Sequence, residues 1–135
     1  MVEAETLSRE FASVDRPCVL VVDDDERLAD LLRRQLEASG FEVTVATRAA
    51  VALYSIEQSL PDLILLDLVL PDMSGYQLCW TLRQLYPRPM LPIVILTGVE
   101  QSTEDLEREA AGADGYLRKP YDAAELIHML HEVLR

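Results

Sequence analysis

The sequence lacks the features that mark several large classes of protein. No apolar run approaches the roughly 18 residues of a membrane span. The N-terminus is acidic and has no apolar segment, which argues against a signal peptide. Neither a glycine-rich phosphate loop nor a G-x-S-x-G motif is present, so a nucleotide-dependent enzyme and a serine hydrolase both lack support. We therefore expect a cytoplasmic protein with no membrane partner.

Cysteine and positive charge are also scarce. The two cysteines, Cys18 and Cys79, are expected to be reduced and buried as small apolar side chains. Lys and Arg number 12 against 24 Asp and Glu, which gives a formal charge of −12. This excess disfavours nucleic acid as a direct partner and fits a cation site or a basic protein partner.

The length of 135 residues is that of one domain. Residues 1–16 contain no strand-like run and are expected to form a tail or linker. Leu7, Phe11 and Val14 fall at helical spacing, so a short amphipathic helix remains an alternative for this segment. The domain itself is expected to span residues 17–135.

Within that domain, strand-like and helix-like segments alternate five times, which predicts a parallel sheet covered on both faces. The first, third and fourth strands are wholly apolar, as is typical of central strands, whereas the second alternates and the fifth is mixed, as at edges. The doubly wound α/β order 2-1-3-4-5 of flavodoxin-like folds satisfies this pattern. The strands are expected over 18–22, 41–45, 63–66, 92–96 and 115–118, and the helices over 26–39, 48–59, 75–86, 102–111 and from Asp122 onward.

Polar residues follow the carboxyl ends of these strands, where ligands bind in such folds. Acidic residues 23–26 follow the first strand, Asp67 the third, Thr97 the fourth and Lys119 the fifth. Singly, each has an ordinary structural explanation. Together, uncompensated carboxylates at one edge would repel one another, and a hard divalent cation such as Mg²⁺ would offset that repulsion.

One uncertainty concerns the acidic run itself. Asp24 or Asp25 could cap the helix that begins near Glu26 rather than bind a cation.

Four segments carry a specific resemblance to a known family. They are Val21–Asp25, Leu65–Gly75, Pro92–Gly98 and Gly112–Pro120, which occur in matching order and spacing. Over residues 17–135 the chain resembles the receiver domain of response regulators in two-component phosphorelays.

The resemblance implies that Asp67 accepts a phosphoryl group, that Lys119 pairs with a phosphoryl oxygen and that Thr97 donates its hydroxyl to another. It also implies a cis Lys119–Pro120 peptide bond. The chain would then be a signalling domain rather than an enzyme, although it assists its own phosphorylation and dephosphorylation. The implied ligands of Mg²⁺ are Asp23, Asp24, Asp67 and the backbone carbonyl of Val69.

The resemblance further implies how the signal enters and leaves. The phosphoryl donor would be a sensor histidine kinase or a histidine phosphotransfer protein. Thr97 and Tyr116 would form a switch pair that remodels the face made by helix 102–111, strand 115–118 and the last helix. That face would contact a downstream protein target, an output domain or a second copy of the chain.

Two other functions compete with this interpretation. Phosphatases with an aspartyl nucleophile place a second Asp two residues later, whereas this chain has Val69 there. A receiver-like scaffold that works without phosphorylation usually lacks the acceptor, the acidic pair or the lysine, and all of these are present.

Overall fold

The computed structural model describes residues 16–98, 102, 104, 105, 108 and 112–135 of the chain. Five parallel strands form one sheet in the order β2-β1-β3-β4-β5, which confirms the predicted topology. The strands are β1 (Cys18–Val22), β2 (Glu42–Ala46), β3 (Leu63–Asp67), β4 (Ile93–Thr97) and β5 (Gly115–Arg118).

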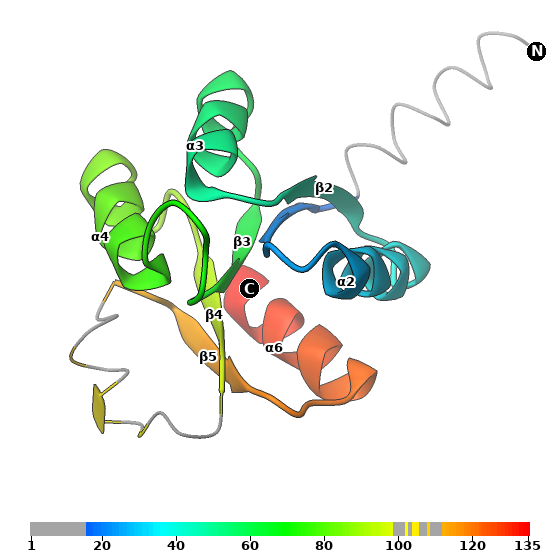
Figure 1. Ribbon diagram of the computed structural model, residues 1–135. Helices are drawn as coiled ribbons and strands as arrows, with labels where there is room; N and C mark the ends of the chain where they lie inside the picture. The colour runs from blue at the N-terminus through cyan, green and yellow to red at the C-terminus, as the bar shows by residue number, and fades with distance from the viewer. Residues whose placement is uncertain (1–15, 99–101, 103, 106–107, 109–111) are drawn as a thin grey trace, which may run out of the picture.

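Helices cover both faces of this sheet, as expected for parallel strands joined by helical crossovers. Figure 1 shows α3 and α4 on one face and α2 and α6 on the other. The helices are α2 (Glu26–Ala38), α3 (Ala49–Gln58), α4 (Gly75–Leu85) and α6 (Ala123–Leu134).

Two predicted segments lie wholly or partly outside the described residues. The tail is one of them, since only Arg16 of residues 1–16 is described. The helix predicted over 102–111 is described at Ser102, Glu104, Asp105 and Arg108 alone, where the Asp105 N–H donates to the Ser102 hydroxyl at 3.1 Å.

The core has two layers because consecutive strand residues point to opposite faces of the sheet. In β3, Ile64 and Leu66 pack with α3 and α4, whereas Leu63 and Leu65 pack with α2 and α6. Strands β1 and β4 follow the same alternation, and every residue of β3 and β4 is buried. Burial on both faces therefore makes these strands the rigid base from which Asp67 and Thr97 extend.

The two edge strands differ from the central ones, as predicted. Residues 42–45 of β2 alternate between exposed and half-buried, only Ala46 of this strand is buried, and β5 buries only Leu117. Gly40 follows α2 with φ of +95°, a conformation that favours glycine. The side chain of Asp122 caps α6 by accepting the Glu125 N–H at 2.8 Å.

The cysteines depart in part from expectation. Cys79 in α4 is a buried free thiol, as predicted. Cys18 is also free but only half-buried, so the prediction of burial is wrong for this residue. Its position explains the difference, because Cys18 opens β1 at the rim of the sheet and its thiol donates to Glu42 on the neighbouring edge strand.

Among the described residues, no helix combines the length and the apolar character that crossing a membrane would require.

Candidate phosphoacceptor and metal site

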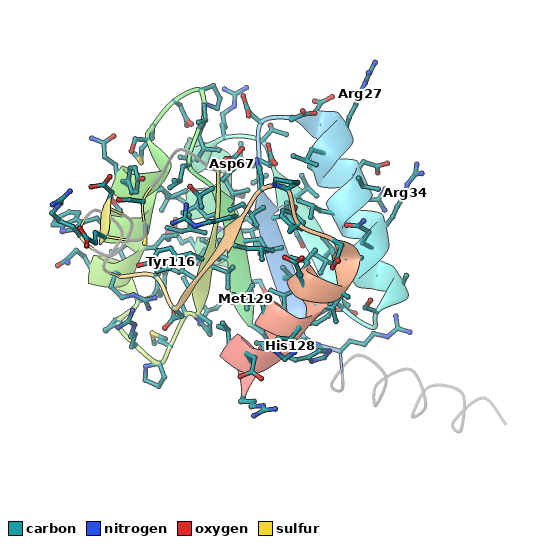
Figure 2. The ribbon with its side chains drawn as sticks, turned by 90° about the horizontal axis from the view of Figure 1, so that it is seen from below. Arg27, Arg34, Asp67, Tyr116, His128 and Met129 are labelled. Carbon is teal, nitrogen blue, oxygen red and sulfur yellow. The ribbon has the colours of Figure 1, made fainter. Side chains whose placement is uncertain are left out.

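The carboxyl ends of four strands bring the predicted polar residues to one edge of the sheet. Asp23 directly follows β1, Asp67 ends β3, Thr97 ends β4 and Lys119 follows β5. Asp23, Asp67 and Thr97 are the buried polar side chains of the described structure. Figure 2 shows Asp67 at this end of the sheet. Asp24 is exposed and Lys119 is half-buried, so the edge is a partly buried polar site.

Three carboxylates gather at the switch point between β1 and β3. Oxygen atoms of Asp23, Asp24 and Asp67 all lie within 4.8 Å of one another. Burial raises the pKa of Asp23 to about 6, and the nearby charge of Asp67 adds to the effect. The sequence therefore predicted correctly which acids meet here.

One oxygen of Asp23 has a partner and the other does not. The Asp25 N–H donates to Asp23 Oδ1 at 3.0 Å. Asp23 Oδ2 is buried and, within the described structure, has no hydrogen-bond partner. An orphaned carboxylate oxygen is costly to bury, so it fits the coordination of a hard cation such as Mg²⁺.

The structure separates the roles of the two exposed acids in the run. Asp25 is the N-cap of α2, since its side chain accepts the N–H groups of Arg27 at 3.1 Å and Leu28 at 3.2 Å. Asp24 lies in the acidic cluster instead. The alternative that one of the pair caps the helix is therefore correct for Asp25.

Lys119 places a positive charge beside the acids. Its Nζ lies 3.7 Å from Asp67 Oδ2, and its backbone N–H donates to the Thr97 carbonyl at 2.7 Å. The peptide bond between Lys119 and Pro120 is cis, as the resemblance implied. The end of β5 is thus joined to the end of β4 with the ammonium directed at Asp67.

The two residues of the expected switch pair lie on adjacent strands. Thr97 is buried, and its hydroxyl donates to the Gly98 carbonyl at 3.4 Å. Tyr116 lies two residues before the end of β5 and is half-buried against the core layer that α4 covers (Figure 2). Strand pairing places Tyr116 opposite Ile95, two residues before Thr97.

The spacing between Asp67 and Gly75 has a steric reason. The Gly75 N–H donates to the Leu68 carbonyl at 2.9 Å, which folds the loop tightly back onto β3. A Cβ atom at Gly75 would lie 2.5 Å from Leu68 Cα and 2.7 Å from the carbonyl oxygen of Asp67. Ser74 then begins α4 with a capping box that includes Gln77.

Sequence reasoning missed one residue of this loop. Asp72 accepts the N–H groups of Ala49 at 2.8 Å and Ala50 at 2.9 Å, and these bonds lower the pKa of its carboxyl. A signal for it existed, because the residue preceding α3 is Arg48, whose side chain makes no cap hydrogen bond. The N–H groups of such a helix can be satisfied by water or by another part of the chain, so this signal does not identify Asp72 as the partner.

The fold and this edge define a doubly wound α/β protein whose site combines an acidic cluster, a lysine and a buried hydroxyl at the switch point. The family model of the response regulator receiver domain matches residues 19–131. The chain belongs to this family, whose members are the receiver domains of two-component response regulators.

Similarity to known proteins, in sequence and in structure, supports this family membership. The chain is 42% identical to the phosphate regulon transcriptional regulatory protein PhoB of Rhizobium meliloti over 88% of this chain and 52% of that protein. It is 34% identical to the DNA-binding dual master transcriptional regulator RpaA of Synechocystis over 88% and 49%. The crystal structure of a CheY-like receiver domain protein from Methanospirillum hungatei superposes with a TM-score of 0.78 at 34% identity, covering 89% of this chain and 94% of that one.

The chain thus spans about half the length of these two curated relatives. One of them is named as DNA-binding, so the expectation that nucleic acid is not a direct partner has no support from the comparisons. That expectation rested on a net charge of −12, which describes this chain and not the further half of the relatives.

Proposed function

We propose that this domain accepts a phosphoryl group on Asp67, in the presence of Mg²⁺, from a sensor histidine kinase or a histidine phosphotransfer protein. The observation that carries the proposal is the meeting of Asp67 with two further acids on one side and Lys119 on the other. Membership of the receiver family supports this choice of donor.

Each residue has a distinct part in the proposed reaction. A carboxylate oxygen of Asp67 attacks phosphorus while the bond from phosphorus to the donor nitrogen breaks, and that electron pair stays on the imidazole. The Lys119 ammonium pairs with a phosphoryl oxygen, and the Thr97 hydroxyl donates to another. The product is an acyl phosphate on Asp67.

The same arrangement suits Mg²⁺. Asp23, Asp24 and Asp67 would hold the ion together with the backbone carbonyl of Val69. The buried Oδ2 of Asp23, which has no hydrogen-bond partner among the described residues, supports this set. Bound Mg²⁺ supplies positive charge that offsets the charges of the carboxylates and of the phosphoryl oxygens.

The test is phosphorylation by acetyl phosphate with Mg²⁺, measured by intact-protein mass spectrometry. We expect the wild-type chain to gain one phosphoryl group and Asp67→Asn to gain none, because an amide is not a nucleophile toward phosphorus. Asp30→Asn, which changes a half-buried acid on α2 outside the site, is the control and should be labelled normally.

Each competing function predicts a different result in the same experiment. Turnover of acetyl phosphate without retained label would favour the phosphatase, and no reaction of the folded protein would favour the scaffold. A label that persists in Asp67→Asn would contradict the acceptor assignment.

We further propose that the signal leaves through the surface formed by segment 102–111, β5 and α6, which would contact a protein target, an output domain or a second copy. Thr97 turns toward the phosphoryl group in this mechanism, and Tyr116 turns inward to bury its ring. Beryllofluoride, which mimics the phosphoryl group, should therefore shift amide resonances across residues 98–131. Shifts confined to the surroundings of Asp67 would contradict this route.

A further inference from the structure

The first turn of α3 is capped by a residue that is distant in sequence. Its own N-cap residue, Arg48, is extended and makes no side-chain cap bond. The carboxylate of Asp72 supplies two bonds instead, to Ala49 N at 2.8 Å and Ala50 N at 2.9 Å. A negative charge at a helix N-terminus satisfies unpaired N–H groups and interacts favourably with the helix dipole.

Asp72 belongs to the acceptor loop, which we define as residues 68–74 between β3 and α4. The two ends of this loop are bonded to each other at the start of α4. Val69 pairs with Ser74 in an antiparallel bridge, and the Leu68 carbonyl accepts the Gly75 N–H. Asp72 attaches the loop to α3, so the loop is held by both helices on this face of the sheet (Figure 1).

The loop also carries a residue of the proposed site. Val69 lies two residues after Asp67, and its N–H donates to Asp67 Oδ1 at 3.4 Å. The side chain of Val69 is 72% exposed, so little packing of its own fixes the backbone at this position. The bonds to Asp72, three residues further on, restrict how far that backbone can move.

We propose that Asp72 is a positioning residue for the metal site: by capping α3 it fixes the acceptor loop so that the backbone carbonyl of Val69 is available to Mg²⁺. This inference rests on the proposed function, since it assumes that Mg²⁺ binds beside Asp67. It differs from a purely structural cap, which would stabilise α3 and leave the metal affinity unchanged.

The experiment compares three variants of the full chain. Asp72→Ala removes both cap bonds. Ala49 and Ala50 donate to different carboxylate oxygens, so Asp72→Asn, which keeps one oxygen, can still accept one of the two bonds. Ser55→Gly weakens α3 without touching the loop. The Kd for Mg²⁺ is measured by isothermal titration calorimetry below the unfolding temperature. We expect Asp72→Ala to weaken Mg²⁺ binding severalfold, Asp72→Asn to weaken it less than Asp72→Ala does, and Ser55→Gly to bind within about twofold of wild type.

Equal Mg²⁺ affinity of wild type and Asp72→Ala, with a loss of thermal stability similar to that of Ser55→Gly, would show a purely structural cap and overturn the proposal. Equal weakening in Ser55→Gly would also overturn it, because any damage to α3 would then suffice.

A second measurement separates this proposal from the proposed function. Amide spectra without metal should show shifts at residues 68–71 in Asp72→Ala that are smaller in Asp72→Asn, which keeps one of the two acceptor oxygens. If wild type binds no Mg²⁺, the metal part of the proposed function fails, and these spectra still decide the positioning role. Shifts confined to the first turn of α3 would refute it.

Discussion

Single residues at the carboxyl edge are held in states that would be costly without a partner. Asp23 is fully buried, and its Oδ2 has no hydrogen-bond donor within the described structure. Lys119 is 3.7 Å from Asp67 and offsets part of the acidic charge. The chemistry of the site therefore depends on which atoms lie close to Asp67. Val69, two residues further along the chain, is one position where a substitution should change that chemistry.

Val69 should lengthen the life of the phosphoryl group. Its side chain is apolar and cannot hold a water molecule for attack on phosphorus. Val69→Asn should therefore speed loss of the label severalfold after acetyl phosphate is removed, as measured by intact mass over time. Val51→Asn, which changes an exposed valine on α3, is the control. An unchanged or slower loss in Val69→Asn would contradict the mechanism. Val99, the other apolar residue expected to flank the group, lies outside the described residues.

Cys18 should be an unreactive thiol near neutral pH. Burial raises its pKa to about 11, and the hydrogen bond to Glu42 adds to this effect. The thiolate fraction at pH 8 should thus be about 100-fold below that of a thiol with a pKa of 9.0. Alkylation by iodoacetamide, followed by peptide mass mapping, measures the rate. Glu42→Gln should react faster, and rapid alkylation of the wild type at pH 8 would refute the expectation.

At the scale of elements, the site depends on how tightly the acceptor loop joins β3 to α4. The loop is closed by the bond from Gly75 to Leu68 and by the capping box of Ser74. It is also attached to α3 through Asp72. These contacts connect two helices on one face of the sheet to the backbone that follows Asp67.

Gly75→Ala should damage this junction. The new methyl group would overlap Leu68 Cα and the carbonyl oxygen of Asp67, so the backbone beside the acceptor must shift. We expect a loss of about 1–3 kcal/mol in the free energy of unfolding. The rate of labelling by acetyl phosphate should fall as well.

Gly40→Ala is the matched control. Gly40 has a positive φ, which an alanine adopts only with backbone strain, and it lies far from the site. It should lower stability by roughly 1–2 kcal/mol and leave the labelling rate unchanged. Equal labelling rates for both variants would show that the Gly75 junction does not position the acceptor.

At the scale of the whole molecule, negative charge is both abundant and unevenly placed. The formal charge is −12, and three acids converge at a single edge of the sheet. Repulsion among them opposes folding, and a ligand that binds only the folded state stabilises it by mass action. The stability of the domain and the occupancy of its site are therefore linked.

Mg²⁺ should raise the midpoint of thermal unfolding. At a concentration 100 times the Kd, the expected stabilisation is about 2.7 kcal/mol. Differential scanning calorimetry with and without Mg²⁺ measures the shift, and removal of the ion with EDTA should reverse it. Asp24→Ala removes one proposed ligand and should show a smaller shift. The proposed set of Mg²⁺ ligands would be wrong if Mg²⁺ raised the unfolding midpoint of wild type and Asp24→Ala equally, or raised neither.

Much of the fold follows from the pattern of apolar and polar residues along the chain. Wholly apolar runs are typical of central strands, and the alternating run of β2 and the mixed run of β5 are typical of edges. The order of the strands then brought Asp23, Asp67, Thr97 and Lys119 to one edge. These predictions succeeded because they depend only on the apolar pattern of each strand and on the order of the strands in the sequence.

The roles of the individual acids depend on contacts that the order of residues along the chain does not reveal. Asp24 and Asp25 are adjacent and chemically identical, and the geometry of α2 alone makes Asp25 the cap. Cys18 stands in an apolar run typical of the core, but its place at the rim of the sheet leaves it only half-buried. Asp72 and the first turn of α3 are 22 and 23 residues apart, and nothing local pairs them. Such contacts join segments that only the folded chain brings together, so they cannot be predicted from neighbouring residues in the sequence.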